Sequence, residues 1–456
     1  MLPGSNVHVG NPIMYHESGR VTVQVEIAWD NAWHNDRNHD AVWVFAKFVQ
    51  DNGWNRHMHL LPAGNEIGAL TDNMPEMAVQ CASDGLGLIV HADERWRGDI
   101  RGILTMQVDT ATFRGTHPGA GSIQVFAIEM VYVPQGAFYL GDLDARALDY
   151  GAMYLSDANG ESRGPFRVNS EDQVIEVGAT DGALYYRSDL RYQGDQSGPI
   201  PASFPKGVEP FYCMKYELSQ GQYADFLNCI SAAQTQFRAN FGGRDYEQLR
   251  GTISRENNRY SARRPDRPCN FYSWDDAMAY ADWAGLRPMT ELEFTKACRG
   301  PAQPQAMEYP WGTGPKHEML RRVNGDDDLV MLNGMDESDL SDATRSLFGA
   351  SYYWVMDLAG SVWERVITIG DAQGRAFTGQ HGDGRLTGMG YANVEDWPAG
   401  NDEQGGFGFR GGGYYRHDRS YTIFNPYSPI AFRRFGAWSG GVRSEAYGGR
   451  FVRTAE

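Results

Sequence analysis

The chain has 456 residues, 54 of them glycine, with 12% aromatic residues and a formal net charge of −17. A chain of this length is too long to fold around one hydrophobic core, so two or three domains are predicted. The acidic balance argues against nucleic acid as a partner, because phosphate binding needs a basic surface. No apolar run reaches the 18 residues that a membrane-spanning helix needs. The five cysteines form no CxxC pair, and they are interpreted as small buried hydrophobic residues rather than a disulfide framework.

The first part of the chain alternates between apolar and polar residues in the manner of β-strands. Its β-branched and aromatic runs cover Val21–Trp29, Ala41–Val49, Gly102–Asp109 and Ser122–Val133, separated by turn residues. Several such strands predict a small β-sandwich of the immunoglobulin-like type, placed at residues 1–125.

Four histidines lie in this predicted sandwich: His34, His39, His57 and His59. His57 and His59 are two apart, so on a strand both rings would point to one face, as a metal site requires. No third ligand accompanies that pair in the sequence. Polar surface histidines are therefore the favoured interpretation, with a metal pair as the alternative.

The second part, residues 126–456, contains three short helical patterns among long stretches rich in Gly, Asp, Asn and Pro. Each helix begins at a Ser or Thr N-cap, and two of the three end at a glycine. The signals are Ser219 with Gln222, Ser273 with Gly285, and Thr290 with Glu293 and Gly300.

Six motifs in this part occur in a characteristic order. They are MVYVPQGAFYLGD, FYCMKYELSQGQYADFL, CNFYSWDDAMAYADWAGLRPMTELEFTKACRG, YPWGTG, MDLAGSVWE and FRGGGY followed by GGRFVRT. Together they resemble the formylglycine-generating-enzyme type of C-type lectin fold, in the sulfatase-modifying factor superfamily. The resemblance implies an α+β domain in which Trp283, Trp311 and Trp363 are buried anchors. It also implies that Arg410 and Arg450 are buried and tie loops together.

The segment 414–447 has an unusual composition, with nine aromatic residues, five arginines and no Lys, Leu, Met or Gln. It lies in a C-terminal region, about 410–453, where this chain resembles the variable proteins of diversity-generating retroelements. In those proteins, mutated adenines turn asparagine codons into codons for other residues, but not for Lys, Gln, Glu, Met or Trp. Trp438 and Glu445 do not fit that pattern and would be fixed positions.

This segment is predicted to be a recognition surface, because Tyr, Arg, Ser, Gly and Asn are typical of binding loops. Its five arginines against Asp418 and Glu445 give a local charge of +3 on an acidic chain. A protein ligand is therefore expected in preference to a carbohydrate. The predicted contact residues are Tyr414, Tyr415, Arg416, His417, Tyr421, Phe424, Asn425, Tyr427, Phe432, Arg434, Phe435, Trp438 and Tyr447.

The resemblance also bears on catalysis. Formylglycine-generating oxidases use a cysteine pair just before the final Gly-Phe-Arg, whereas this chain has no cysteine after position 414. No catalytic residue and no catalytic cofactor is therefore predicted, and the expectation is a display protein that is not an enzyme. The alternatives are a catalytic member of the superfamily and an adhesin or lectin of fixed specificity.

Structural calcium is the cofactor that the resemblance allows. The matching ligand positions are Asn324 with Asp326, and Ser361 with Glu364, where Ser361 replaces the family's usual asparagine. Calcium prefers carboxylate and carbonyl oxygens, so the serine weakens the second of these sites. The predicted role and the abrupt start of the sequence lead us to expect a secreted or cell-surface protein.

Overall fold

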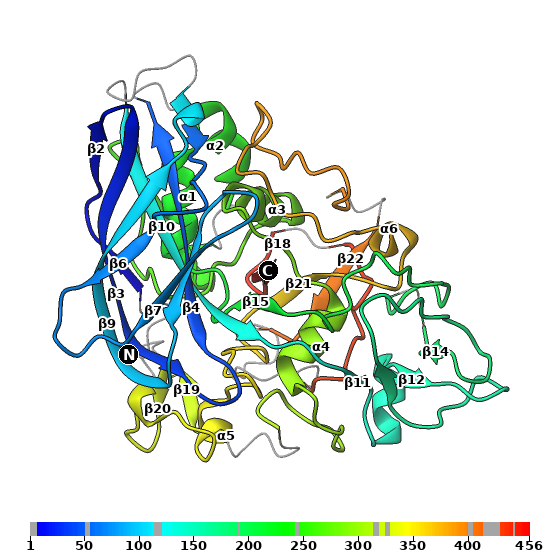
Figure 1. Ribbon diagram of the computed structural model, residues 1–456. Coiled ribbons are helices and arrows are strands. Elements are labelled where there is room, and N and C mark those ends of the chain that lie inside the picture. The colour runs from blue at the N-terminus through cyan, green and yellow to red at the C-terminus, as the bar shows by residue number, and fades with distance from the viewer. Residues whose placement is uncertain are drawn as a thin grey trace.

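The computed structural model describes residues 7–50, 55–113, 121–189, 192–241, 246–312, 319–323, 329–399, 405–413, 429–440 and 443–456. It combines large antiparallel sheets with a few short helices (Figure 1). Within those ranges, no helix has the length and apolar character needed to cross a membrane.

The N-terminal part begins with a five-stranded antiparallel sheet. Its strands follow the order β1 (Val7–Val9), β3 (Arg20–His34), β9 (Trp96–Val108) and β6 (Glu66–Ala69), and β2 (Ile13–Glu17) also pairs with β3. The long β3–β9 ladder shifts register between Trp29 and Ala32. A bulge of this kind sharpens the local twist of the strand, just before β3 ends at His34.

A second sheet of eight strands joins the two parts of the chain. Its order is β18 (Arg287–Pro288), β24 (Phe451–Thr454), β15 (Phe211–Met214), β10 (Ser122–Val133), β4 (Asp40–Val49), β8 (Leu88–Ala92) and β7 (Met77–Cys81), with β5 (Asn55–His57) paired to β4. Strand β10 pairs with β4 on one side and with β15 on the other. The boundary expected at residue 125 thus falls inside a strand that both parts share.

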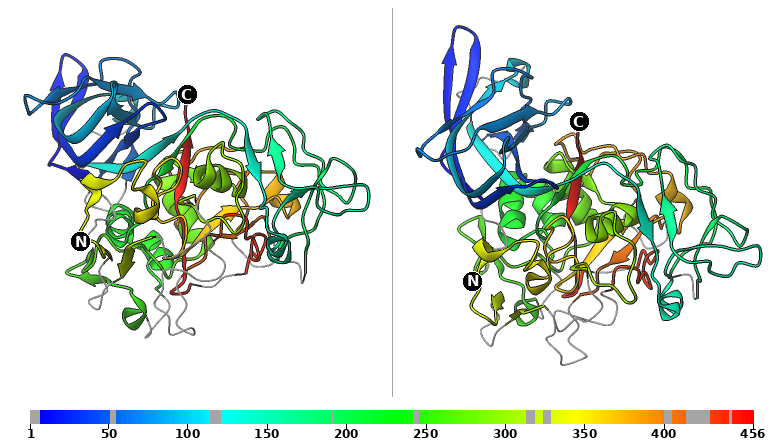
Figure 2. Two further views of the ribbon diagram at one scale, coloured as in Figure 1. Left: turned by 90° about the horizontal axis from the view of Figure 1, so that it is seen from below. Right: turned by 60° about the horizontal axis from the view of Figure 1, so that its bottom comes forward.

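The strand β4 is buried on both faces, which explains its nearly continuous apolar sequence. Val42 and Val44 join a core that also contains Val25 and Leu104 from the first sheet. On the opposite face, Trp43 belongs to the core of the C-terminal part. The two N-terminal sheets therefore face each other as a sandwich beside the larger C-terminal part (Figure 2). The immunoglobulin-like topology stays a prediction.

The three predicted helices form as α1 (Gln220–Cys229), α3 (Trp274–Trp283) and α4 (Glu291–Arg299), each with a complete capping box. A fourth helix, α2 (Ala232–Arg238), begins at Ser231, whose side chain accepts a hydrogen bond from the backbone N–H of Gln234. It was not predicted. The shorter α5 (Arg345–Phe348) and α6 (Ala372–Arg375) follow later in the chain.

The rest of the C-terminal part consists of small sheets joined by loops. The two-stranded sheets pair β11 (Phe138–Leu140) with β13 (Phe166–Val168), β12 (Tyr154–Leu155) with β14 (Leu184–Tyr185), β16 (Ile253–Glu256) with β17 (Arg259–Ala262), and β19 (Arg321–Val323) with β20 (Leu329–Met331). Short 3-10 helices cover Thr110–Phe113, Ala145–Tyr150, Glu247–Leu249 and Glu337–Asp339. A three-stranded sheet places β21 (Trp363–Ile367) between β22 (Phe407–Arg410) and β23 (Tyr447–Gly448).

The predicted anchors of the C-terminal part are confirmed. Trp283, Trp311 and Trp363 are at most 2% exposed, and Arg410 and Arg450 are equally buried. The last strand, β24, runs through the middle of the molecule, where it pairs with β15 and β18 (Figure 2).

Candidate functional site

Six aromatic side chains gather at the β21–β22–β23 sheet, and we call them the C-terminal aromatic cluster. They are Tyr192, Trp363, Phe409, Phe435, Trp438 and Tyr447. Trp363 and Phe409 form its buried base, at 2% and 1% exposed. Phe435, Trp438 and Tyr447 are half-buried, and Tyr192 is 37% exposed. The cluster therefore has an apolar floor and a solvent-facing rim.

Trp438 is the centre of this arrangement. Its ring centroid lies 5.7 Å from that of Phe409, 6.0 Å from that of Tyr447 and 6.1 Å from that of Tyr192. These are the separations at which aromatic rings attract in tilted and edge-to-face pairs. Each ring thus holds its neighbours in place, and the rim is organised before any ligand arrives.

The backbone around Trp438 is fixed by hydrogen bonds as well. The amide of Phe409 in β22 donates to the carbonyl of Phe435 at 2.9 Å, and the amide of Ala437 donates to the carbonyl of Tyr192 at 2.9 Å. Beneath the rings, the guanidinium of Arg365 lies 4.9 Å from the centroid of Phe409. Burial lowers the pKa of Arg365 to about 10, and its charge is placed for a cation–π contact.

A buried ion-pair network lies under the loop that carries these residues. The carboxylate of Glu291 accepts from Arg433 Nε at 2.9 Å and from Arg410 Nη1 at 3.3 Å. Burial alone would raise the pKa of Glu291, but Arg433 and Arg410 outweigh it and lower the pKa. Arg410 Nη2 also donates to the carbonyl of Ile430 at 2.6 Å, so this pair of arginines ties the 429–440 loop to α4.

The predicted contact residues divide into three groups. Phe435, Trp438 and Tyr447 belong to the aromatic cluster, and Arg434 is half-buried in the same loop. Phe432 does not fit a ligand-contacting role, because it is 3% exposed and stacks on Tyr150 at 4.0 Å between centroids. The remaining eight lie outside the described residues: Tyr414, Tyr415, Arg416, His417, Tyr421, Phe424, Asn425 and Tyr427.

The second predicted calcium position is a buried acidic site, whereas Asn324 and Asp326 of the first lie outside the described residues. Glu364 accepts from Arg450 Nε at 2.8 Å through Oε1, and its Oε2 has no hydrogen-bond partner among the described residues. The same is true of Glu217 Oε2. Burial raises the pKa of both carboxyl groups, and the negative charges of Asp357 and Glu364 raise the pKa of Glu217 further. Ser361, at φ +57°, turns the chain beside them.

This donor set fits a hard cation. When ionised, two buried carboxylates with unpaired oxygens are costly without positive charge, and of their four oxygens Arg450 contacts only Glu364 Oε1. A bound calcium ion would supply positive charge, and the unpaired oxygens of Glu217 and Glu364 are of the ligand type that it takes. The presence of calcium remains a prediction.

The thiols offer no reactive group. All five cysteines are free, and Cys213, Cys229, Cys269 and Cys298 are buried. Burial raises the pKa of each thiol, including the half-buried Cys81, so none is a thiolate at neutral pH.

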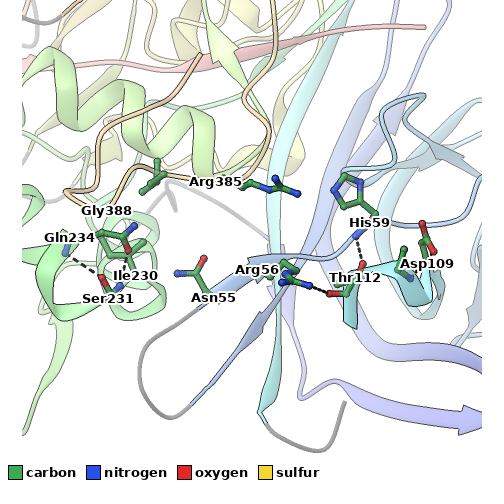
Figure 3. A pocket seen from close by; sticks show the side chains of 12 residues that line it. Asn55, Arg56, His59, Asp109, Thr112, Ile230, Ser231, Gln234, Arg385 and Gly388 are labelled. Carbon is green, nitrogen blue, oxygen red and sulfur yellow. Dashed lines mark hydrogen bonds between the residues drawn. The ribbon is translucent and has the colours of Figure 1, made fainter. Parts of the chain in front are cut away.

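A cavity of about 830 Å³ lies between the N-terminal sandwich and α2 (Figure 3). Arg56 and His59 line it from the sandwich, Ser231 and Gln234 line it from the α2 side, and Arg385 lies between these two walls. Of the residues that the sequence analysis singled out, His59 lines this cavity, whereas the predicted ligand-contact and calcium residues do not. Its amide and guanidinium groups suit polar solutes, and no nucleophile hydrogen-bonded to a base is seen among the described residues that line it.

The histidines that lie close together in the structure are not the predicted pair, His57 and His59. The ring of His57 is buried, with Nε2 2.6 Å from the carbonyl oxygen of Leu86, and its centroid lies 6.4 Å from that of His59; among the described residues no third ligand joins this pair. Instead, His34, His39 and His91 lie together. Burial lowers the pKa of His39 to about 2, with a further contribution from its two histidine neighbours. The sequence separates His91 from the others by more than fifty positions, and only the pairing of β4 with β8 brings it near.

The fold and the order of its elements define a class of protein. The family described as "Sulfatase-modifying factor enzyme 1-like domain" matches residues 124–454, and the chain belongs to this family. The match starts inside β10 and includes the aromatic cluster, both buried arginine networks and all three predicted helices.

Among individual proteins, the chain is similar to two kinds of enzyme. The formylglycine-generating enzyme of Bos taurus is 27% identical over 195 residues, which cover 37% of this chain and 51% of that protein. The formylglycine-generating enzyme of Thermomonospora curvata is 36% identical over 102 residues, which cover 22% of this chain and 33% of that protein. The hercynine oxygenase of Mycolicibacterium thermoresistibile is 41% identical over 63 residues, or 14% of each chain. The chain thus spans at most about half the length of these relatives.

These similarities correct one expectation. The absence of a C-terminal cysteine pair predicted that the protein is not an enzyme, and that prediction is wrong, because the relatives are named as enzymes of two different activities. The absence of that cysteine pair argues only against the reaction that uses it. One fold can carry several different catalytic activities, so other activities are not excluded by this absence.

Proposed function

We propose that this protein binds a protein or peptide ligand at the C-terminal aromatic cluster. The observation that carries the proposal is the rim formed by the exposed Tyr192 and the half-buried Trp438 over a buried base. Solvent-facing aromatic groups cost little rotamer entropy on binding and supply large contact areas. Recognition surfaces are concentrated in such residues.

The support beneath the rim strengthens this proposal. Binding is tighter when the contact residues are ordered in advance, because less entropy is lost on association. The Glu291 network and the backbone hydrogen bonds of Phe435 and Ala437 hold the loop, while Arg434 adds positive charge on an acidic molecule. The ligand that suits this surface has apolar or aromatic groups beside carboxylates.

We further propose that the segment 414–447 is diversified by a retroelement, with Trp438 and Glu445 as fixed positions. The support is its composition, which excludes Lys, Gln and Met. The test is the flanking DNA, which should hold a reverse transcriptase gene and a near-copy of this coding segment that differs at adenines. Without such a repeat, the surface would be one of fixed specificity.

Binding can be tested with a random-peptide phage library panned on the full chain. The affinity of a selected peptide is then measured by fluorescence anisotropy. We expect Trp438→Ala to weaken binding about thirtyfold, the effect of losing a central aromatic contact worth about 2 kcal/mol. Tyr192→Ala tests the exposed rim with less risk to folding, since Tyr192 is 37% exposed.

The matched control is Tyr15→Ala. Tyr15 lies on β2 and is 43% exposed, so it is a surface tyrosine of the N-terminal sandwich. Its loss should leave the affinity unchanged. If both Trp438→Ala and Tyr192→Ala bind the peptide as well as the unmodified chain, the aromatic cluster is not the binding surface.

Oxidative catalysis is a second candidate, favoured by the names of the relatives. Formylglycine is the aldehyde that oxidation at Cβ of a serine or cysteine residue would produce, and a bound peptide would place such a residue at the cluster. The test is to incubate the full chain in air with copper or iron salts and with peptides containing serine or cysteine, or with hercynine. Mass spectrometry would detect an aldehyde or an added oxygen. Unchanged substrates in all arms would refute this candidate and leave the binding proposal intact.

We propose calcium as a structural ion at Glu217 and Glu364. The support is the pair of unpaired, buried carboxylate oxygens. The ion would brace the turn at Ser361, which leads directly into β21 and the base of the aromatic cluster.

A further inference from the structure

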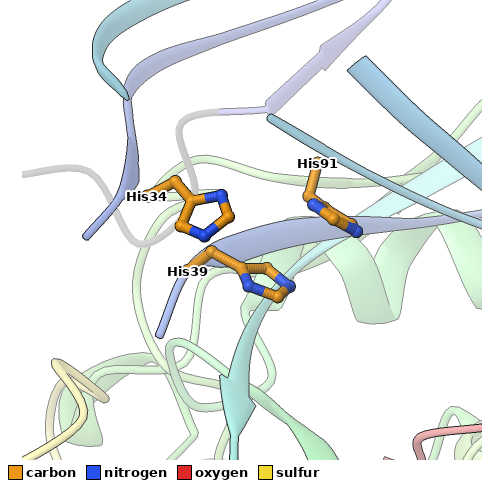
Figure 4. Close-up of side chains that lie close together, drawn as sticks. All are labelled: His34, His39 and His91. Carbon is orange, nitrogen blue, oxygen red and sulfur yellow. The ribbon is translucent and has the colours of Figure 1, made fainter. Parts of the chain in front are cut away.

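Three histidines from separate segments of the N-terminal sandwich converge near its junction with the C-terminal part (Figure 4). His34 is the last residue of β3, His39 directly precedes β4, and His91 belongs to β8. His34 and His39 form an isolated antiparallel bridge, and His91 lies beside them through the pairing of β8 with β4. One ring nitrogen from each histidine lies within 4.8 Å of the others.

The backbone fixes the tautomer of two of these rings. The carbonyl oxygen of Ala92 is 2.7 Å from His34 Nδ1 and 2.8 Å from His91 Nδ1. A carbonyl can only accept, so in both neutral rings Nδ1 carries the proton and donates. Nε2 of each ring is then left with a free lone pair. Metal-binding histidines commonly use this arrangement, in which the second nitrogen donates to a backbone carbonyl and orients the ring.

The third ring is held by its surroundings. His39 stacks on Tyr132 with 4.8 Å between centroids and on His91 with 4.2 Å. The turn before it is closed by Asn38, whose side-chain amide donates to the carbonyls of Tyr132 and Tyr353 at 2.9 and 3.0 Å. His39 therefore has little freedom to turn away from its neighbours.

The site is also open on one side. His34 and His91 are half-buried, whereas His39 is buried. An ion could enter from solvent, bind three nitrogens and keep a water molecule at the remaining position. Sites with three histidine ligands and one open position are the form that reactive zinc sites take.

We propose that His34, His39 and His91 bind one borderline divalent transition-metal ion, such as Zn²⁺ or Co²⁺. Neutral imidazole is the ligand that such ions prefer. In a tetrahedral site with metal–nitrogen distances near 2.05 Å, the nitrogens would be about 3.4 Å apart. The widest present separation, 4.8 Å, must then shorten by about 1.4 Å, through rotations of the half-buried His34 and His91 that keep each Nδ1 within reach of the Ala92 carbonyl.

The probe is Co²⁺ added to the full chain after removal of any histidine tag. Tetrahedral Co²⁺ absorbs visible light, so binding is read directly, and Zn²⁺ should abolish the signal by competition. We expect one equivalent to bind. His91→Ala should bind at least about 100-fold more weakly, because even the groups that only orient metal ligands contribute about 10- to 100-fold.

His34→Ala is a second variant, and it should lose Co²⁺ in the same way. Both replaced side chains are half-buried, so the fold should survive, and circular dichroism without metal checks this. The matched control is His16→Ala, an exposed histidine on β2 of the same sandwich, which should bind like the unmodified chain. The proposal is wrong if the unmodified chain shows no Co²⁺ absorption, or if His91→Ala and His34→Ala retain it.

Discussion

The N-terminal sandwich and the loop region around the aromatic cluster are ordered by different interactions. The sandwich has long antiparallel ladders, and its core is apolar, with Val25, Leu104 and their neighbours fully buried. The 429–440 loop contains no strand, and it is held by Arg410 and Arg433, both paired with Glu291.

The contrast shows how a fold with little regular structure can present a rigid surface. Regular strands satisfy their own backbone groups, so apolar burial suffices to hold them. A loop cannot do this, and its carbonyls need donors from elsewhere. Buried arginines supply several donors each, as Arg410 does for the carbonyl of Ile430. The cost is that each arginine depends on a carboxylate.

Removing that carboxylate should have the largest effect. Glu291→Ala leaves two guanidinium groups buried without their partner, which we expect to cost about 3–5 kcal/mol of unfolding free energy. Urea unfolding measures this loss. Replacing Glu291, Arg410 and Arg433 together by apolar residues of similar size should cost less than the single change. If the triple variant were the less stable of the two, the unpaired charges would not be the cause.

The corresponding experiment in the sandwich is to shorten a buried apolar side chain of its core. Leu104 is 0% exposed, and Leu104→Ala should cost about 3 kcal/mol through lost burial and a residual cavity. Peptide binding at the aromatic cluster should be unaffected in the fraction that stays folded. The neighbouring Thr105→Ala, on the partly exposed face of β9, should cost less than about 1 kcal/mol. Equal losses for the two variants would contradict the sandwich core as described.

Calcium removal tests the acidic site. A bound ion stabilises the folded chain by mass action, so we expect EGTA to lower the melting temperature by a few degrees. In Glu217→Gln, a ligand oxygen is replaced by a neutral amide, and EGTA should then have little effect. If neither EGTA nor added Ca²⁺ changes the melting temperature of the unmodified chain, the proposal that calcium binds at this site is wrong.

A pH-dependent effect is expected at the junction between the two regions. Lys47 of β4 is fully buried and donates through Nζ to the carbonyl of Gly384 at 2.9 Å. Burial lowers its pKa from 10.5 to about 7, so between these values the unfolded chain binds more protons than the folded one. Lys47 therefore makes stability rise with pH over that window.

Lys47→Met should remove this dependence. We expect the unfolding free energy of Lys47→Met to exceed that of the unmodified chain at pH 7, and this difference should shrink as the pH rises to 9. The reason is that burying lysine costs less free energy when its amine is deprotonated, and a higher pH favours the deprotonated form. Urea titrations at several pH values measure it. A difference that stays constant with pH would show that Lys47 keeps an ordinary pKa.

Much of the fold could be predicted because its signals are local. The caps at Ser219, Ser273 and Thr290 lie within three residues of the groups they satisfy, and each of those helices forms where it was expected. Helix α2 carries the same signal, Ser231 with Gln234, but its seven residues offer too few turns to show an apolar face.

The candidate sites were only partly accessible from the sequence. The aromatic composition after position 414 pointed to the region of Trp438 and Tyr447, but it could not distinguish the buried Phe432 from the half-buried Phe435. Burial depends on what packs against a residue, and the partner of Phe432 is Tyr150, far away in the chain.

The sequence by itself determined four long strands of the sandwich and three helices, through periodicity and caps, and its ordered motifs implied the buried arginines. Only the tertiary structure decided which groups meet. Glu291 finds Arg433 across 142 positions, and His91 joins His34 and His39 because β8 pairs with β4. The physical reason is that a cap is satisfied by its nearest neighbours, whereas a buried charge or a metal-binding histidine takes its partner from whichever strand the sheet order places beside it.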